Sequence, residues 1–243
     1  MQFFEYGKVD GVPLVFLLGP PHTGDSVAEL SELASHWGIR LICPTRPWYA
    51  GTAVEPSFAA STGPIIDYLH QHGIRRACAI GGSGGGPFAL HLTTNHTDTF
   101  DACYLLASMG TPEIFMDKVA SPQSRLLIEL FRAKSYAQTV AQLGEWGMTE
   151  QLAHGVWSDF KVLFGSWESI RLDADIAVRI HHGRSDDNAP LESVQALALQ
   201  LADSEFRISP TASHLGLAND EDFTEFRTIF ADVAGRQFAP DVR

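Results

Sequence analysis

Residues 79–88 constrain this chain more than any other stretch, because they place one serine among glycines where a strand-like segment meets a helix-like one. Residues 76–80 have the apolar character of a short buried strand, and Pro87 is tolerated in the first turn of the helix that follows. Glycines stand two positions before and two positions after Ser83. So sharp a turn holds the serine at a strained positive φ and needs glycine where backbones approach closely. The stretch therefore predicts a nucleophile elbow, which lifts the Ser83 hydroxyl clear of the sheet.

A glycine-rich turn before a helix has two other interpretations. It can bind phosphate, but the lysine of a P-loop is missing, and Pro87 stands where a dinucleotide-binding G-x-G-x-x-G frame needs its last glycine. It can also be a purely structural turn. In the elbow interpretation, the N–H of Gly84 lies at a helix N-terminus, where it would stabilise an oxyanion.

Composition favours one large globular domain with a sizeable core, since 45% of the 243 residues are hydrophobic. The net charge of −12 argues against nucleic-acid and anionic-membrane partners, although a local site for a small anion stays compatible with it. The first residues lack the basic start and apolar core of a signal peptide, and no 18-residue apolar stretch is present. We expect a cytoplasmic protein without a membrane partner.

Cysteine and histidine usage gives no sign of a disulfide framework or a metal site. The three cysteines, Cys43, Cys78 and Cys103, lie in strand-like apolar runs, so we expect buried, reduced thiols. No H-E-x-x-H motif or clustered Cys/His spacing is present. We predict neither a metal nor a cofactor. The oligomeric state is not fixed by the sequence, which is compatible with a homodimer.

Apolar runs alternate with longer amphipathic segments along most of the chain. Several of the runs are continuously apolar, which is typical of a parallel sheet covered by helices on both faces. We therefore predict an open, mostly parallel α/β sheet, with residues 2–13 adding an antiparallel hairpin at one edge. The predicted strands are 14–18, 39–43, 77–80, 102–107, 177–181 and 205–208, and the predicted crossover helices are 26–37, 58–70, 87–94, 191–201 and 221–233.

The alternation stops between residues 109 and 175, where only helical patterns occur. We interpret 109–175 as a helical cap inserted into a core formed by 1–108 and 176–243, a placement suited to covering a pocket. The alternative is a further helical layer without a role in substrate binding. Large apolar residues of this segment favour an apolar pocket, although such spacing equally suits a simple core: Phe115, Leu127, Phe131, Trp146, Trp157, Phe164 and Trp167. The predicted cap helices are 113–119, 123–133, 137–146, 150–157 and 160–167.

A serine nucleophile needs a base, and the base needs a third group that orients it. Asp186 follows the predicted strand 177–181, and His214 follows the strand 205–208. Because loops after parallel strands share one edge of a sheet, Ser83, Asp186 and His214 can converge there. Asp187 competes with Asp186 for the third position.

These motifs together resemble the α/β-hydrolase superfamily, in its cap-bearing branch of small esterases, lactonases and carbon–carbon bond hydrolases. The order Ser83, Asp186, His214 is the order of that fold. Residues 182–190 resemble the family's H-G-x-x-D-x-x-x-P acid loop, and 212–214 resemble its histidine loop, with Ser213 where glycine is usual. The resemblance covers essentially the whole chain and implies a Ser-His-Asp triad. A serine at the elbow excludes the aspartate nucleophile of related dehalogenases and epoxide hydrolases.

The chain departs from this pattern in two loops. In relatives, an H-G-x sequence follows the strand that here is 14–18, and the N–H of x completes the oxyanion hole. Pro20 occupies x and has no N–H. Three interpretations are open: a side chain of His22 or Thr23 substitutes, another N–H serves after a loop shift, or the reaction does not need two donors. In the loop 44–51, Trp48 replaces the first glycine of D-R-P-G-x-G, and it either lines the pocket or packs against the cap.

The sequence thus predicts a serine hydrolase that cleaves an ester, lactone or similar apolar acyl substrate through an acyl-enzyme. Ser83, His214 and Asp186 would be catalytic, Gly84 would donate to the oxyanion, and Pro20, His22 and Trp48 would border the site. Pro20 motivates a second hypothesis, a lyase or cyclase in which His214 moves protons without an acyl-serine. A third hypothesis is a ligand-binding protein whose catalysis has decayed.

Overall fold

The computed structural model describes residues 1–214 and 223–236. Seven strands form one open sheet in the order β1-β3-β2-β4-β5-β6-β7. All neighbouring pairs are parallel except β1 and β3. The predicted mostly parallel α/β sheet is therefore confirmed, and the strands are β1 (Gln2–Gly7), β2 (Val12–Leu17), β3 (Ile39–Thr45), β4 (Ala77–Gly82), β5 (Phe100–Leu106), β6 (Ala177–Gly183) and β7 (Asp203–Ser209).

Helices cover both faces of the sheet, which explains why the central strands are apolar throughout. On β2, Leu14 and Phe16 pack on one face and Val15 and Leu17 on the other. The first face is covered by η1 (Gly24–Leu30), α1 (Ser31–His36) and α10 (Thr224–Gly235). The second is covered by α2 (Phe58–Gln71), α3 (Gly86–Asn95) and α8 (Leu191–Ala198). Alternate side chains thus enter two separate hydrophobic cores, so neither set can be polar.

The predicted hairpin in residues 2–13 is wrong in its pairing. The strand β1 is antiparallel and lies at the edge, but it pairs with β3 and not with β2. The strand β2 has parallel neighbours on both sides, so its hydrogen-bonding edges are occupied. An ion pair between Glu5 and Arg40, with 2.8 Å between Oε2 and Nε, links β1 to β3 and suits a half-exposed edge.

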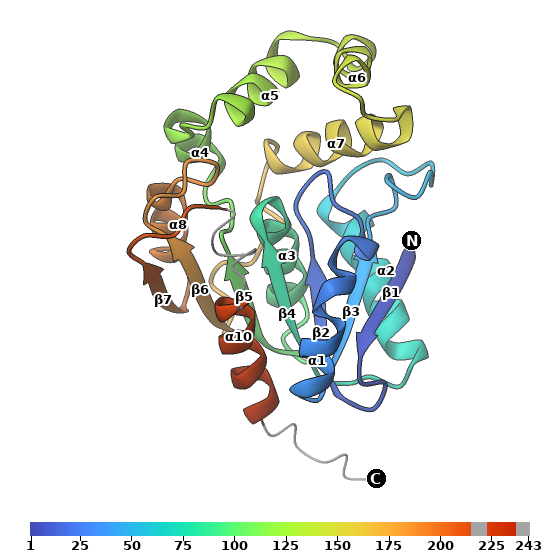
Figure 1. The fold of residues 1–243 in the computed structure, drawn as a ribbon, viewed down its shortest axis with the longest axis vertical. Helices are drawn as coiled ribbons and strands as arrows, with labels where there is room; N and C mark the ends of the chain where they lie inside the picture. The colour runs from blue at the N-terminus through green and yellow to red at the C-terminus, as the bar shows by residue number, and fades with distance from the viewer. Residues whose placement is uncertain (215–222, 237–243) are drawn as a thin grey trace.

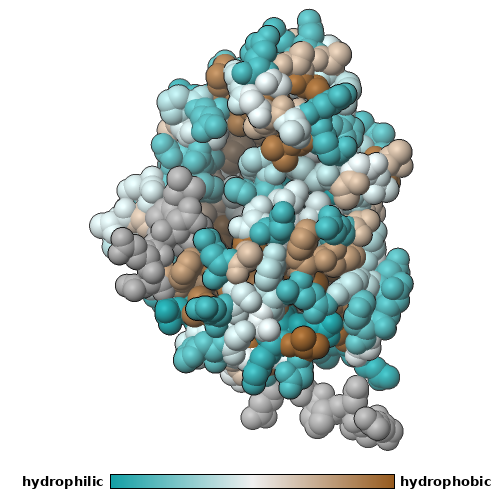
Figure 2. Space-filling view, turned by 45° about the vertical axis from the view of Figure 1, so that its right-hand side comes forward, coloured by the Kyte–Doolittle hydropathy of each residue, from teal (hydrophilic) through white to brown (hydrophobic). Residues whose placement is uncertain are grey.

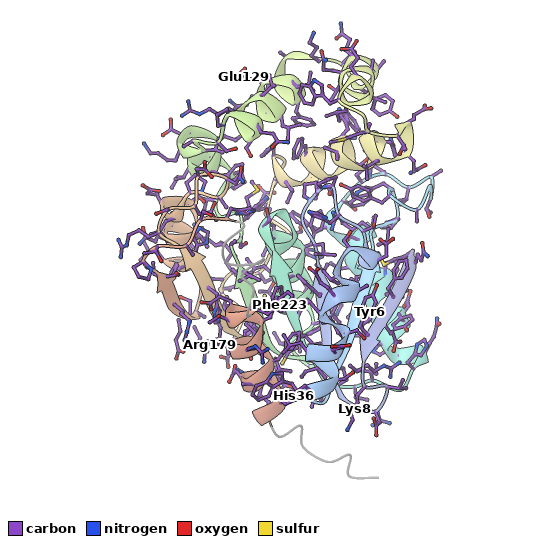
Figure 3. All side chains as sticks on the ribbon, viewed as in Figure 1. Tyr6, Lys8, His36, Glu129, Arg179 and Phe223 are labelled. Carbon is purple, nitrogen blue, oxygen red and sulfur yellow. The ribbon has the colours of Figure 1, made fainter. Side chains whose placement is uncertain are left out.

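Four helices lie between β5 and β6, in the segment predicted to be an insertion. They are α4 (Pro112–Lys118), α5 (Pro122–Ala133), α6 (Tyr136–Glu145) and α7 (Glu150–Leu163). In Figure 1 they extend beyond one end of the sheet, with α5, α6 and α7 at the top of the view. Glu129 is exposed on α5 between the buried Ile128 and Leu130 (Figure 3). We call α4 to α7 the insertion.

The structure differs from the expected helices at several ends. Residues 150–163 form one helix, α7, where the sequence predicted two, because the polar pair at 158 and 159 is buried inside it and not at a break. The expected helix 26–37 is divided into a 3-10 segment, η1, and α1, and the helix predicted at 191–201 ends at Ala198. Of the predicted helix 221–233, residues 221 and 222 lie outside the described residues.

Candidate active site

Ser83 directly follows β4 and begins the short 3-10 turn η2 (Ser83–Gly85), which leads into α3. Its φ of 53° lies in the left-handed region that non-glycine residues rarely adopt. A Cβ on Gly85 would lie 2.1 Å from the carbonyl oxygen of Leu17, so β2 crosses the turn at backbone distance. The sharp, glycine-dependent turn expected from residues 79–88 is present, and the Ser83 side chain is half-buried at its tip.

Three loops at the carboxyl edge of the sheet bring Ser83, Asp186 and His214 together. The His214 Nε2 lies 3.0 Å from the Ser83 Oγ, and the His214 Nδ1 lies 2.8 Å from the Asp186 Oδ2. The arrangement can pass the serine proton to the imidazole while the carboxylate holds the opposite nitrogen in its N–H form. The sequence placed these three residues at one edge, and the structure joins them by hydrogen bonds.

The Asp186 carboxylate is oriented by its own loop. Its Oδ1 accepts the backbone N–H groups of Asn188, at 3.0 Å, and Ala189, at 2.7 Å, which leaves Oδ2 for His214. Asp187 is exposed, and its carbonyl accepts the N–H groups of Ala120 and Ser121 at 2.9 Å each. Of the two candidate carboxylates, Asp186 therefore contacts the histidine, while the backbone of Asp187 holds the insertion.

A cavity of about 220 Å³ opens beside Ser83 and His214. Its wall is mostly apolar, with His22, Ser26 and Glu29 as polar side chains. Over the face in Figure 2, hydrophobic residues gather in patches between hydrophilic ones. The remaining lining residues are Phe16, Leu18, Gly19, Val27, Leu30, Gly82, Leu106, Ala107 and Phe226.

The loop after β2 passes directly over the turn at Ser83. A Cβ on Gly19 would lie 2.8 Å from the Gly84 nitrogen and 3.0 Å from the Ser83 Cβ, so only glycine fits there. Pro20 packs on the same turn, with its Cδ 2.8 Å from the position of a Cβ on Gly84. The sequence prediction that Pro20 borders the serine agrees with this contact.

Backbone donors are scarce in this loop. Pro20 and Pro21 have no N–H. The His22 N–H donates to the Gly19 carbonyl at 3.0 Å, and the Thr23 N–H donates to the Ser26 hydroxyl at 3.2 Å. Between residues 20 and 23, every backbone nitrogen is thus either without a proton or already bonded.

Of the two side chains considered as substitutes, His22 lines the cavity with Ser83. The Thr23 hydroxyl instead donates to Asp25. Desolvation and the nearby Arg46 guanidinium lower the pKa of His22, which favours the neutral imidazole with its one N–H donor. His22 therefore borders the cavity, and Thr23 does not.

Trp48 does not line this cavity. Its side chain is fully buried, and its Nε1 donates to the Asp159 Oδ1 at 2.9 Å. Asp159 lies on α7, so Trp48 packs against the insertion, which was the second of the two expectations for it. The substitution of tryptophan for glycine thus fills space between the core and the insertion.

Sequence reasoning missed Asp159 altogether. Its carboxylate is fully buried and forms an ion pair with Arg46, with 2.6 Å between Oδ2 and Nη2. The signal was present, because Val156, Val162 and Leu163 stand three or four positions away and mark an apolar helix face. A carboxylate on such a face needs a buried cationic partner.

The described residues contain no group of three or more His, Cys, Asp or Glu side chains that could hold a metal ion. In residues 1–214 and 223–236, no helix is long and apolar enough to cross a bilayer. Cys43, Cys78 and Cys103 are free and buried.

Neither family models nor curated protein sequences gave a match to this chain. Solved structures do resemble it. An esterase from Exiguobacterium antarcticum is 17% identical, with 96% of this chain and 95% of that chain covered and a TM-score of 0.69. A bromoperoxidase from Bacillus anthracis is 17% identical, with the same coverage and a TM-score of 0.67.

A meta-cleavage product hydrolase from Pseudomonas fluorescens is 19% identical, with 95% of this chain and 92% of that chain covered and a TM-score of 0.64. These proteins share little sequence with the chain and yet match it over nearly its full length. The likeness of these proteins to the seven-stranded, mostly parallel sheet of this chain is one of fold. The chain therefore has the α/β-hydrolase fold.

Proposed function

We propose that the protein is a serine hydrolase that cleaves an ester, lactone or related acyl substrate. The Ser83 oxygen attacks the carbonyl carbon while His214 takes the hydroxyl proton, and Asp186 stabilises the resulting imidazolium. His214 then gives this proton to the departing alkoxide, which leaves an acyl-serine. Water, deprotonated by His214, attacks the acyl carbon and releases the acid and free Ser83.

The observation that carries this proposal is the pair of hydrogen bonds at His214, 3.0 Å to Ser83 and 2.8 Å to Asp186. A positive φ at the serine supports it, because such strain is characteristic of functional positions. The predominantly apolar cavity beside Ser83 supports an apolar acyl group. We further propose that the segment 109–175, which contains the insertion, acts as a cap over the substrate, because Leu163 of α7 lies against the turn at Gly84.

In this mechanism the oxyanion would take one hydrogen bond from the Gly84 N–H and one from the His22 imidazole. Gly84 follows the nucleophile at a helix N-terminus, where the local field favours negative charge. The lowered pKa of His22 and its place in the cavity wall support the second role. Loss of one oxyanion donor lowers rates by roughly a hundred- to a thousandfold, so the second donor matters.

Hydrolysis of p-nitrophenyl butyrate, with a fluorophosphonate label for the nucleophile, tests the proposal. We expect the purified protein to turn over the ester and to take the label at Ser83, and we expect Ser83→Ala to lose both. Absence of both in the unaltered protein would overturn the proposal and favour a ligand-binding protein.

A second candidate is a lyase or cyclase that uses His214 as an acid and base without an acyl-serine. The absence of a free backbone N–H from Pro20 to Thr23 favours it, because such a reaction needs no two-donor oxyanion hole. Pro20→Ala distinguishes the two candidates. A large gain in esterase rate supports a hydrolase limited by its donor, whereas fluorophosphonate labelling without ester turnover in either form supports the lyase or cyclase.

A further inference from the structure

The strongest feature outside the triad is the set of bonds around Asp159 on α7. Its carboxylate accepts Arg46 Nε at 2.7 Å and Arg46 Nη2 at 2.6 Å. It also accepts the Trp48 indole N–H at 2.9 Å and the Tyr49 hydroxyl at 2.6 Å. Four donors therefore converge on one carboxylate that water does not reach. We call Arg46, Trp48, Tyr49 and Asp159 the clasp.

Stability alone gives no reason for this arrangement. A buried ion pair loses the hydration of both charges, and well-packed apolar side chains commonly stabilise a fold as well or better. The bidentate fork of Arg46 instead fixes direction, because two parallel N–H···O bonds define the plane of both groups. The clasp is thus suited to setting the geometry of something that Arg46 touches.

Arg46 also contacts the two segments that flank Ser83. Its Nη1 donates to the carbonyl of Leu18, the residue immediately before Gly19 and Pro20. Its guanidinium lies 5.1 Å from the ring centroid of Phe88, in the first turn of α3. One planar group thus connects α7 of the insertion, the loop after β2 and the helix that follows the elbow.

We propose that Arg46 and Asp159 are positioning residues, which hold the loop 18–23 so that His22 and Gly19 keep their places beside Ser83. The role rests on the proposed hydrolase function and extends it to residues that touch neither substrate nor nucleophile. Loss of this positioning should lower kcat and leave substrate affinity unchanged, because the oxyanion forms only after binding. The positive charge of Arg46 acts in the same direction, since it helps to keep the His22 ring neutral.

The chain offers a matched control for this proposal. Lys161, also on α7, pairs with Glu55 of the loop that follows β3, but both residues are exposed. The two ion pairs therefore join the same helix to the same loop region. Only the clasp reaches Leu18. Lys161→Gln removes the exposed pair and leaves the clasp intact.

The first test measures kcat and KM for p-nitrophenyl butyrate, with active sites titrated by a fluorophosphonate so that misfolded protein is not counted. For Asp159→Asn we expect kcat per titrated site to fall at least tenfold, with KM changed less than about threefold. Arg46→Lys keeps the charge but loses the fork, so we expect a similar loss there. Lys161→Gln should match the unaltered protein. Equal kcat per titrated site in all four proteins would overturn the positioning role.

A second test does not depend on catalysis. Amide hydrogen exchange of a peptide covering residues 18–23 should quicken in Asp159→Asn and Arg46→Lys, because the N–H groups of His22 and Thr23 are held within that loop. It should stay unchanged in Lys161→Gln. Unchanged exchange in the clasp variants overturns the proposal even if the protein is an esterase. Faster exchange in a protein without esterase activity would retain the clasp and refute the hydrolase.

Discussion

The two halves of the site are built by different means. On the core side, Ser83 is held by backbone packed against backbone, with Gly85 against β2 and Gly19 against Gly84. On the insertion side, the contact with the loop before Pro20 runs through buried charged side chains, Arg46 and Asp159, which are 113 positions apart. The comparison indicates that the core side relies on close backbone contacts at glycines, whereas the insertion side relies on one buried pair of charged side chains.

The largest expected effect comes from replacing Asp186, the carboxylate on the core side of the site. Asp186→Asn keeps an acceptor for the N–H groups of Asn188 and Ala189 but turns an amide toward His214, which favours the wrong tautomer. We expect kcat for a p-nitrophenyl ester to fall about 10⁴-fold. Asp187→Asn is the control. Its kcat should stay within about twofold of that of the unaltered protein, because the Asp187 side chain is exposed and does not contact His214. Equal losses in the two variants would contradict the assignment of Asp186.

The next effect tests the contact between Asp159 and Arg46, which is the joint between the two halves. Asp159→Ala leaves Arg46 buried without a counterion and leaves the N–H of Trp48 and the hydroxyl of Tyr49 without their acceptor. We expect the free energy of unfolding, measured in urea, to fall by about 3–5 kcal/mol. A loss below about 1 kcal/mol would mean that this joint contributes no more than an exposed pair.

Adding a Cβ to Gly85 on the core side should lower the free energy of unfolding by a similar or smaller amount. In Gly85→Ala the new Cβ meets the Leu17 carbonyl at 2.1 Å, and neither backbone can move without disturbing β2 or the elbow. We expect a loss of about 3 kcal/mol in the free energy of unfolding. Gly63→Ala on α2 is the control, since nothing lies within 4 Å of its Cβ position, and there we expect a gain of about 0.4–1 kcal/mol. A neutral Gly85→Ala would show that the elbow tolerates a wider turn.

The pH dependence of the free energy of unfolding shows whether the buried His91 is neutral in the folded protein. On α3, His91 stacks on Phe58 and its Nδ1 lies 3.1 Å from the Thr62 hydroxyl. Burial lowers the pKa of His91 to about 4. The unfolded chain binds this proton below about pH 6.5 and the folded chain only near pH 4, so stability is full above 6.5 and declines between the two values.

Over that interval the contribution of His91 should amount to about 3 kcal/mol. Urea unfolding from pH 7 to pH 4 measures it, with His91→Gln for comparison. We expect the variant to have a shallower decline, whatever its stability at pH 7. Parallel curves for the two proteins would show that His91 titrates normally. Because His182 is also buried with a lowered pKa, only the difference between the curves reports on His91.

The smallest effect belongs to the exposed pair between insertion and core. Lys161→Gln should change the free energy of unfolding by less than about 1 kcal/mol, because solvent screens exposed charges and the pair restricts two long side chains. High salt should reduce even this difference. A loss as large as that of Asp159→Ala would remove the distinction between the buried and the exposed connection.

The parts of the molecule that the sequence predicted are those determined by local pattern. Continuous apolar runs indicated the two-faced parallel sheet, and the glycines around Ser83 indicated the elbow. Asp186 and His214 were found because parallel strands deliver their loops to one edge. The choice of Asp186 over Asp187 rested on motif spacing, and its catalytic role stays a prediction.

The parts that were missed depend on partners distant in the sequence. The edge strand β1 pairs with β3 and not with β2, the next strand in the sequence. No local turn signal reveals this pairing. The predicted helices 150–157 and 160–167 left Asp159 between them without a role, because its polarity is explained only by Arg46 in a distant loop. The position of Trp48 follows from the same carboxylate. These contacts can be identified only once the fold is known, because each of them is determined by burial and not by local conformation.

The unbroken course of α7 couples two contacts that would otherwise be independent. Asp159 is bound to Arg46, and four residues later Leu163 lies against the turn at Gly84, with its Cδ1 3.1 Å from a Cβ position there. Four residues of helix span about 6 Å and move as one rigid turn. A bulky ligand that displaces this turn would shift both segments that flank Ser83 in the same direction. In the proposed hydrolase, altering α7 to admit larger substrates should therefore also disturb the turn at Ser83 and lower the rate.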